Sequence, residues 1–211
     1  MARILITSGP TRQYLDPVRY LSNASSGQMG SCLAQAAIDF GHQVTIVSGP
    51  VSVEYPDGAK VIEVVSTEDM LQAATKAFNE CDGCIAAAAP CDYKPATLAT
   101  QKIKKTGDGV ELKLVETSDI VGTLGQSKKT SQWCVCFALE TEDGHNRALK
   151  KLKKKNCDLV VLNDASAIDS TENQVDIIGV AGTTIKSAKG PKPDVAKAIM
   201  KVIQDQLIDR S

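Results

Sequence analysis

The amino-acid sequence predicts an α/β fold of three layers, in which a mainly parallel sheet carries helices on both faces. Apolar segments typical of buried strands alternate along the chain with amphipathic segments of helical period, and this alternation favours parallel strands. The 211 residues, 43% of them hydrophobic, suffice for one large α/β domain. Because neither a linker nor an internal repeat interrupts the pattern, we expect a single domain over residues 1–211.

The first half of the chain supplies two helices and the first strands. A helix over about residues 27–40 follows a long loop, with Ser25 or Ser26 as its cap and Gly41 as its stop. A second helix, over about residues 66–79, begins with Ser-Thr-Glu-Asp, which is a capping-type start. Strands are expected at Arg3–Ser8, Val44–Ser48, Val61–Val65 and Cys84–Ala88.

The middle of the chain predicts an extended hairpin that leaves the sheet. Pro90–Thr100 is irregular, and Lys102–Lys105 and Glu111–Val115 are extended segments on either side of Gly107-Asp-Gly109. We therefore expect an excursion of paired chain here, inserted between two βα units.

The last third of the chain returns to the alternation. A helix is expected from Ser118 to about Gln126, a second follows the next strand and ends at about Lys155, and a third covers Asp194–Ile208. Strands are expected at Trp133–Ala138 and Leu159–Leu162. A terminal hairpin is expected from Val175–Val180 and Thr183–Ile185, around Gly182. The whole pattern is Rossmann-like. In such sheets ligands bind beyond the carboxyl ends of the strands, at a switch in strand order, and several polar loops point to that edge.

Charge and cysteine content restrict the partners. The net charge of -1 argues against nucleic acid as the main partner, and no apolar run approaches the roughly 20 residues that span a membrane. Seven cysteines form no disulfide framework, so we expect the reducing cytoplasm. Cys81 and Cys84 make one C-x-x-C without a second pair, and we expect no metal site built by the protein alone.

The stretch Leu21-Ser-Asn-Ala-Ser-Ser-Gly-Gln-Met-Gly30 lies where a strand should pass into a helix. A glycine-rich helix start offers unpaired N–H groups and a positive dipole end, so an anion, most naturally a phosphate, is the expected guest. The spacing is not that of a dinucleotide-binding turn, and the second strand ends at Ser48-Gly-Pro50 without an acid for a ribose. An NAD(P)-dependent reductase and a non-catalytic nucleotide-binding module remain alternatives.

Other candidate residues surround this helix start in the sequence. Arg19 can clamp a phosphate or carboxylate, and Asn23 offers a donor and an acceptor suited to holding an oxyanion, although the segment also reads as a surface loop. The small residues Ala86–Ala89 leave room for a flat base, or simply pack tightly in a core. Asp92 can accept a hydrogen bond from a base or sugar, or lie behind a metal ion.

Lysines form two further groups. Lys102 and Lys104 share a face if their segment is extended, and Lys151 and Lys155 are i,i+4 neighbours on a helix. Taken alone, both groups read more simply as solvated basic surfaces. Cys91 has no histidine partner that the sequence can name, so a thiol nucleophile is not expected.

Together these segments resemble the phosphopantothenoylcysteine synthetase family, the nucleotide-dependent ligases of coenzyme A biosynthesis, in bacteria often the C-terminal half of a bifunctional CoaBC (Dfp) flavoprotein. The matching segments run in the family's order across nearly the whole chain. They are Leu5-Ile-Thr-Ser-Gly-Pro-Thr-Arg12, Leu15-Asp-Pro-Val-Arg19, Ser22-Asn-Ala-Ser-Ser-Gly27 with Met29-Gly30, Val47-Ser-Gly-Pro50, Asp92-Tyr93, Lys102-Ile-Lys-Lys105, Asp119-Ile-Val121, Phe137-Ala-Leu-Glu-Thr141 and Asn163-Asp164. Two departures are Pro10, where a second glycine is common, and Cys91, where alanine is more familiar.

The resemblance implies a catalytic set of Asn23, Lys102 and Arg19, with Asn23 processing an acyl-nucleotide intermediate and Lys102 serving the first half-reaction. It implies a ligase that joins 4′-phosphopantothenate to L-cysteine, uses Mg²⁺ with CTP (ATP is possible), has no flavin in this chain and forms a homodimer through the extended excursion. The implied nucleotide contacts are Ser26, Gly27, Ala86, Ala87, Ala88, Asp92, Lys102, Ser118, Asp119, Ile120, Val121, Phe137, Lys151 and Lys155.

Overall fold

The structure is a computed structural model, and it describes residues 1–105, 107, 109–140, 143–164 and 172–209. Its main sheet consists of β1 (Arg3–Ser8), β4 (Gln43–Ser48), β5 (Ala59–Glu63), β6 (Gly83–Ala86), β9 (Trp133–Glu140), β10 (Leu159–Asp164), β11 (Glu172–Gly179) and β12 (Thr184–Pro191). The strand order is β12-β11-β10-β9-β6-β1-β4-β5. All neighbours are parallel except β11, which runs antiparallel to both β10 and β12. The predicted mainly parallel sheet is confirmed.

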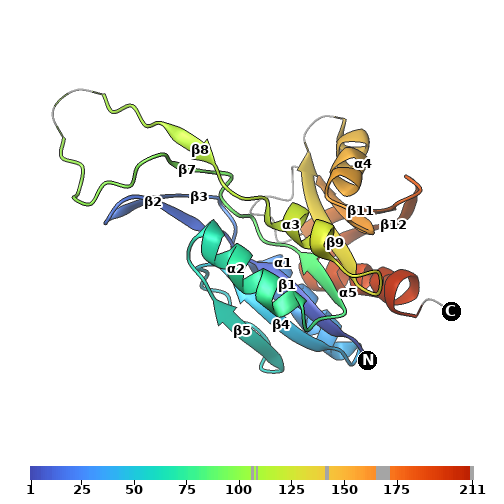
Figure 1. Cartoon of the computed structure of the whole chain (residues 1–211). Helices are drawn as coiled ribbons and strands as arrows, with labels where there is room; N and C mark the ends of the chain where they lie inside the picture. Colours follow the sequence, from blue (N-terminus) through green and yellow to red (C-terminus); the bar gives the residue numbers. More distant parts are fainter. Residues whose placement is uncertain (106, 108, 141–142, 165–171, 210–211) are drawn as a thin grey trace.

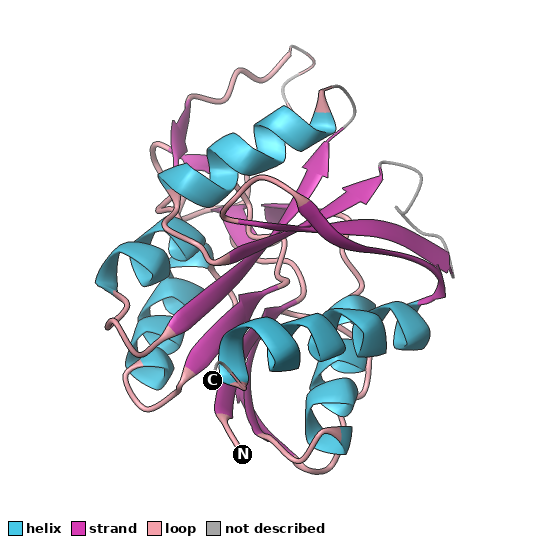
Figure 2. Cartoon of the chain, turned by 90° about the vertical axis from the view of Figure 1, so that its right-hand side faces the viewer, coloured by secondary structure: helices cyan, strands magenta, loops and turns pink. Residues whose placement is uncertain are grey.

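Helices cover the sheet on both faces, as Figure 2 shows. They are α1 (Gln28–Asp39), α2 (Thr67–Phe78), α3 (Ile120–Ser127), α4 (Gly144–Lys154) and α5 (Lys192–Ile203). In β1, Ile4 and Ile6 enter the core beneath α1 and α5, whereas Leu5 enters the core beneath α2, α3 and α4. This alternation is the two-residue period of a strand buried on both sides, and it confirms the three-layer class.

The strand order reverses beside β1. The chain leaves β1 through α1 to reach β4 on one side, and it later returns through α2 to β6 on the other side. The loops that follow β1 and β6 therefore diverge at their carboxyl ends, and a crevice forms between them. This topology places the glycine-rich segment and the small residues after β6 at the same edge of the sheet.

The start of α1 differs from the expected serine cap. Gly27 is the N-cap, with a φ of 77°, and Ser26, just before it, accepts a long hydrogen bond of 3.4 Å from the Gln28 N–H. A Cβ on Gly27 would lie 2.9 Å from Val51 Cγ1, and one on Gly30 would lie 2.1 Å from Ser8 Oγ. Glycine is required at both positions because the helix start is left-handed at one and packs directly on β1 at the other. At the far end, Gly41 stops the helix as predicted, with a φ of 82°.

Other element boundaries follow hydrogen bonds that the sequence does not show. The helix after Ser66 has the predicted capping box with Asp69. The third strand lies two residues earlier than predicted, because the Val65 carbonyl pairs with the Arg12 N–H outside the sheet. Asp119, rather than Ser118, caps α3 by accepting a hydrogen bond from the Gly122 N–H over 2.9 Å.

The segment before the glycine-rich helix start forms a hairpin instead of a plain loop. Strands β2 (Arg12–Asp16) and β3 (Arg19–Ser22) pair antiparallel. The rings of Tyr14 and Tyr20 meet edge to face with centroids 5.4 Å apart, and the Arg12 guanidinium lies 4.6 Å from the centroid of Tyr20. These cross-strand contacts have no signal in the local alternation, which explains why the hairpin was missed.

The predicted excursion is present, but its pairing is different. Strands β7 (Tyr93–Pro95) and β8 (Leu114–Glu116) form a short antiparallel ladder, and the chain between them reaches away from the sheet beside β2 and β3 (Figure 1). We call residues 96–113 the arm. Lys102–Lys105 belongs to the arm and is not a strand, since its backbone pairs with no strand among the described residues. Within the expected turn, Asp108 lies outside the described residues.

The C-terminal part matches the prediction with longer strands. β11 and β12 form the expected hairpin, in which Gly182 has a φ of 83°, and α5 continues into a π-helical turn, η2 (Gln204–Ile208). Strand β6 ends at Ala86, two residues earlier than expected. Within the described residues, the helices are each too short or too polar to cross a membrane.

Candidate functional site

A cleft of about 850 Å³ opens at the carboxyl edge of the sheet, where the strand order reverses. Its walls come from the start of α1, the segments after β6 and β8, the ends of β9 and β10, and the last turns of α4. Fourteen of the sixteen predicted site residues line it. These are Asn23, Ser26, Gly27, Ala86, Ala87, Ala88, Asp92, Ser118, Asp119, Ile120, Val121, Phe137, Lys151 and Lys155.

The α1 start forms one wall of this cleft. Gly27 has no side chain to cap the helix, and apart from the Gln28 N–H, which donates to Ser26 Oγ over 3.4 Å, the N–H groups of the first turn are available to a ligand. The opposite wall is the chain after β6, where Ala86, Ala87 and Ala88 present backbone and methyl groups only. A flat group can therefore lie against the backbone, with an anion at the helix start.

Asn23 is held by two backbone carbonyls. Its Nδ2 donates to the Pro90 oxygen over 2.9 Å and to the Ala89 oxygen over 3.3 Å. Both neighbours are acceptors, so the amide must turn its NH₂ toward them and leave Oδ1 as its free atom. In this arrangement Asn23 has no N–H left for a substrate oxyanion, the role suggested by the sequence. It instead presents an acceptor to the cleft.

Cationic groups lie at the opposite end, on α4. Lys155 Nζ is 2.9 Å from Asp119 Oδ1, and Lys151 lines the same wall one helical turn earlier. Burial raises the pKa of the Asp119 carboxyl, but the Gly122 N–H and the Lys155 ammonium outweigh it and hold that pKa below its usual range. Asp119 is therefore ionised at neutral pH, and it ties the end of α4 to the start of α3.

Two asparagines that the sequence did not assign to the site also line the cleft. The Oδ1 atoms of Asn163 and Asn173 are buried without a hydrogen-bond partner among the described residues, and the Asn173 side chain is only 5% exposed. Buried acceptors of this kind ordinarily have a donor. Asn163 lies at the carboxyl end of β10, and that position could have identified it from the sequence as a cleft residue. Asn173 lies on β11, and nothing in the sequence around it indicates a place in the cleft.

Arg19 and Lys102 are the two predicted site residues that do not line the cleft of their own chain. Arg19 Nη2 donates to the Ile103 carbonyl over 2.9 Å, near the middle of the arm. Asp16, fully buried, joins the same group by accepting from the Val18 N–H over 2.9 Å and the Ile103 N–H over 3.1 Å. Lys102 is exposed beside them. Lys102 therefore belongs to the arm, and Arg19, the first residue of β3, contacts it.

The described residues contain no group of three or more histidine, cysteine or acidic side chains placed to hold a metal ion. Mg²⁺ that arrives on a nucleotide needs only one or two protein carboxylates. Asp92 lines the cleft, and its carboxylate has no partner among the described residues. The residues fit an ion that enters with its substrate.

The arrangement can accommodate a polyphosphate and a second, smaller reactant. Helix N–H groups and lysines suit the phosphates, while the Asn23 acceptor suits an N–H donor. Transfer chemistry in such a site depends mainly on positioning and charge neutralisation.

Comparison with known proteins agrees with the geometry. The family model described as "DNA/pantothenate metabolism flavoprotein C-terminal domain" matches residues 1–207. A curated relative from an unidentified prokaryote, named cysteine/cysteine sulfinic acid decarboxylase, is 40% identical over 95% of this chain and 57% of its own length. The coenzyme A biosynthesis bifunctional protein CoaBC of Vibrio vulnificus (strain YJ016) is 41% identical over 95% of this chain and 51% of its own.

Solved structures extend the likeness to the fold. The crystal structure of the C-terminal domain of coenzyme A biosynthesis bifunctional protein CoaBC superposes with a TM-score of 0.81 at 35% identity, covering 98% of this chain and 96% of the other. The chain thus spans about half the length of the curated relatives it matches and nearly all of this one domain.

Proposed function

The chain belongs to the DNA/pantothenate metabolism flavoprotein C-terminal domain family, and from this premise we propose that it is a phosphopantothenate–cysteine ligase. The observation that carries the proposal is the cleft, which gathers the α1 start, the Asn23 acceptor and two α4 lysines at one edge of the sheet. The family membership agrees with the resemblance read from the sequence.

The proposed reaction has two steps. A carboxylate oxygen of 4′-phosphopantothenate attacks the α-phosphorus of a nucleoside triphosphate, and the α–β bridging bond breaks to release pyrophosphate. The amine nitrogen of L-cysteine then attacks the carbonyl carbon of the acyl-nucleotide, an N–H proton is lost, and the nucleoside monophosphate departs with the electron pair of the acyl–oxygen bond. The product is 4′-phosphopantothenoyl-L-cysteine.

The nucleotide is assigned to the wall between β6, α3 and α4. Lys151 and Lys155 neutralise phosphate charge, while the α1 start takes one phosphate of the bound substrates. Ala86–Ala88 and Phe137 supply flat contact for the base. We propose CTP as the nucleotide, which follows from the family resemblance, and Mg²⁺ carried by its phosphates next to Asp92.

Asn23 serves the second step through its acceptor atom. An amine attacks through its lone pair, so an N–H of cysteine that donates to Asn23 Oδ1 aims that lone pair at the carbonyl carbon. The two carbonyls that hold the Asn23 NH₂ fix this orientation before cysteine arrives. The role is positioning of the nucleophile rather than stabilisation of an oxyanion.

Lys102 and Arg19 enter the proposal through a homodimer. Lys102 does not line the cleft of its own chain, and the arm that carries it extends away from the sheet with Leu98, Val110 and Leu112 exposed. Apolar side chains on a projecting arm favour a second protein surface. We propose that the arm packs on a second copy of this chain and brings Lys102 to the partner's cleft.

A pyrophosphate assay tests the proposal. Purified protein is given CTP or ATP in parallel, with and without phosphopantothenate and cysteine. Pyrophosphate that appears only with phosphopantothenate, and ligated product that appears only when cysteine is added, support the ligase. Release without phosphopantothenate, or none with either nucleotide, contradicts it. The reductase alternative predicts NADPH fluorescence quenching instead, and the family gives it no support.

A further inference from the structure

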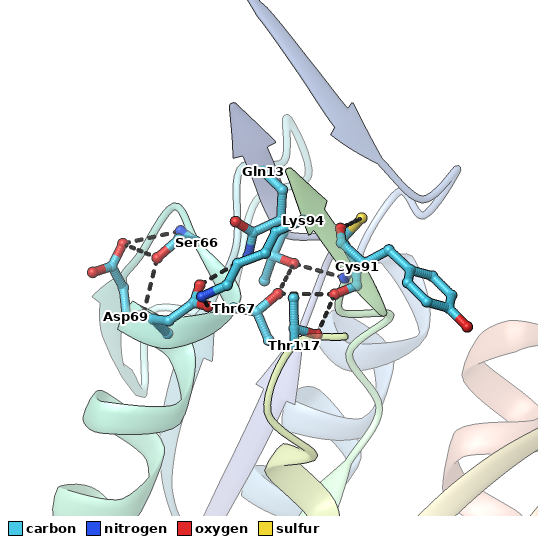
Figure 3. A network of polar contacts seen from close by, with 10 residues as sticks. Gln13, Ser66, Thr67, Asp69, Cys91, Lys94 and Thr117 are labelled. Carbon is cyan, nitrogen blue, oxygen red and sulfur yellow. Dashed lines mark hydrogen bonds and ion pairs between the residues drawn. The ribbon is translucent and has the colours of Figure 1, made fainter. Parts of the chain in front are cut away.

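Cys91 is buried behind the wall of the cleft, in sequence between residues that line it. On one side are Ala89 and Pro90, whose carbonyls hold the Asn23 amide, and on the other is Asp92. The Cys91 peptide is outside the sheet, so its N–H and C=O need other partners. Three threonines from separate parts of the chain supply them, and Figure 3 shows this network around Thr67, Cys91 and Thr117.

The threonines approach Cys91 from three segments. Thr11 precedes β2, Thr67 is the first residue of α2, and Thr117 follows β8. The Cys91 N–H donates to Thr11 Oγ1 over 2.8 Å. The Cys91 carbonyl accepts from Thr67 Oγ1 over 3.2 Å and from Thr117 Oγ1 over 2.7 Å, which uses both of its lone pairs.

A further bond closes a ring. Thr11 Oγ1 and Thr67 Oγ1 are 2.8 Å apart. A hydroxyl has one hydrogen, and that of Thr67 is directed to the Cys91 carbonyl, so Thr11 must donate to Thr67. The bonds therefore run in one direction, from the Cys91 N–H through Thr11 and Thr67 back to the Cys91 carbonyl. Both hydroxyls belong to residues with no exposed surface, where such chains of hydrogen bonds reinforce one another.

We infer that this threonine ring positions Asn23 for the ligation step, by locking the peptide next to the two carbonyls that hold its amide. The inference rests on the proposed ligase function. Thr67 touches no substrate in this assignment and is a positioning residue. Removal of its hydroxyl leaves Thr11 without an acceptor and opens the ring, so the Ala89–Pro90 carbonyls lose their fixed place relative to Asn23.

The test separates the two half-reactions in single turnover. Thr67→Val, of similar shape but without the hydroxyl, should slow formation of ligated product about tenfold, the effect expected when a buried partner is left unsatisfied, while pyrophosphate release per site changes less than about threefold. Thr67→Ser, which keeps the hydroxyl, should restore ligation. Phe78→Leu, at the buried far end of α2, controls for lost stability.

A double-mutant cycle then asks whether Thr67 acts through Asn23. Thr67→Val should add nothing to the ligation defect of Asn23→Ala, because the group it positions is gone. Additive defects overturn the inference, as does equal slowing of both half-reactions or failure of Thr67→Ser to restore ligation. If Thr67→Val does not fold, the same measurements are made on Thr117→Val, which removes the hydroxyl of the half-buried third threonine, and the same results support or overturn the inference. Wild-type protein that makes no product refutes the proposed function instead.

Discussion

The side-chain amide of Asn23 donates to the carbonyl oxygen of Pro90 over 2.9 Å, across a sequence separation of 67 residues. This contact joins the glycine-rich segment after β3 to the chain after β6, which are the two sides of the crevice. It also fixes which end of the amide faces the cleft. The chemical role of Asn23 therefore depends on a residue from a different βα unit.

Asn23→Asp tests that role. A carboxylate cannot donate to the Pro90 and Ala89 carbonyls and is repelled by them, so its orientation is lost. We expect pyrophosphate release of about one equivalent per site in single turnover, followed by a stall before ligation, with a loss of about 10²–10³ in product turnover, the size seen when one catalytic polar contact is removed. Asn146→Asp on α4, an exposed position, is the matched control. Normal product turnover by Asn23→Asp removes Asn23 from the catalytic set.

Lys102→Gln tests the arm. The variant should form the acyl-nucleotide slowly because one phosphate-neutralising charge is missing. Mixing it with Asn23→Asp should recover activity if arms are exchanged, since one cleft of the mixed dimer then receives an intact Lys102 from its partner and keeps its own Asn23. No recovery in mixed dimers, verified by tagged pull-down, places Lys102 in its own chain's cleft. Lys104→Gln, on the same arm, is the control.

The Asp119 carboxylate predicts a pH dependence of stability. Its pKa in the folded chain is lowered, so its contribution is fully present above the unfolded value of about 4 and is lost as the pH falls through the folded value. Asn at this position keeps an N-cap oxygen but no charge. The difference in free energy of unfolding between wild type and Asp119→Asn, measured with urea, should be constant from about pH 5 to 8 and shrink in stronger acid. A difference that does not vary with pH contradicts the ion pair with Lys155.

Asp16→Asn should loosen the hold of the β2–β3 turn on the arm. The buried carboxylate accepts from the Val18 N–H through Oδ1 and from the Ile103 N–H through Oδ2, whereas an amide has one acceptor oxygen. Either the β2–β3 turn or the arm then loses its partner. We expect faster limited trypsin cleavage after Lys102, Lys104 and Lys105, with Asp39→Asn on α1 as an exposed control. Unchanged cleavage rates show that the arm is held by other contacts.

Local sequence patterns were sufficient to predict the regular helices and strands. The glycine at 41, the capping box at Ser66 and the apolar strands all act over a few residues, so their signals are readable in the chain. The β2–β3 hairpin was missed because it depends on contacts between Tyr14, Tyr20 and Arg12 across strands. The pairing expected for Lys102–Lys105 was wrong because a strand needs a neighbour to pair with, and sequence alternation does not supply one.

The sequence by itself determined the three-layer class, the glycine-rich helix start and most residues that line the cleft, because each follows from short-range preferences or from motifs in a fixed order. Only the tertiary structure decided which way the Asn23 amide faces, that Asn163 and Asn173 line the cleft, and that Arg19 and Lys102 lie with the arm. Those features depend on hydrogen-bond partners many residues away, and the strand order selects these partners rather than the local sequence.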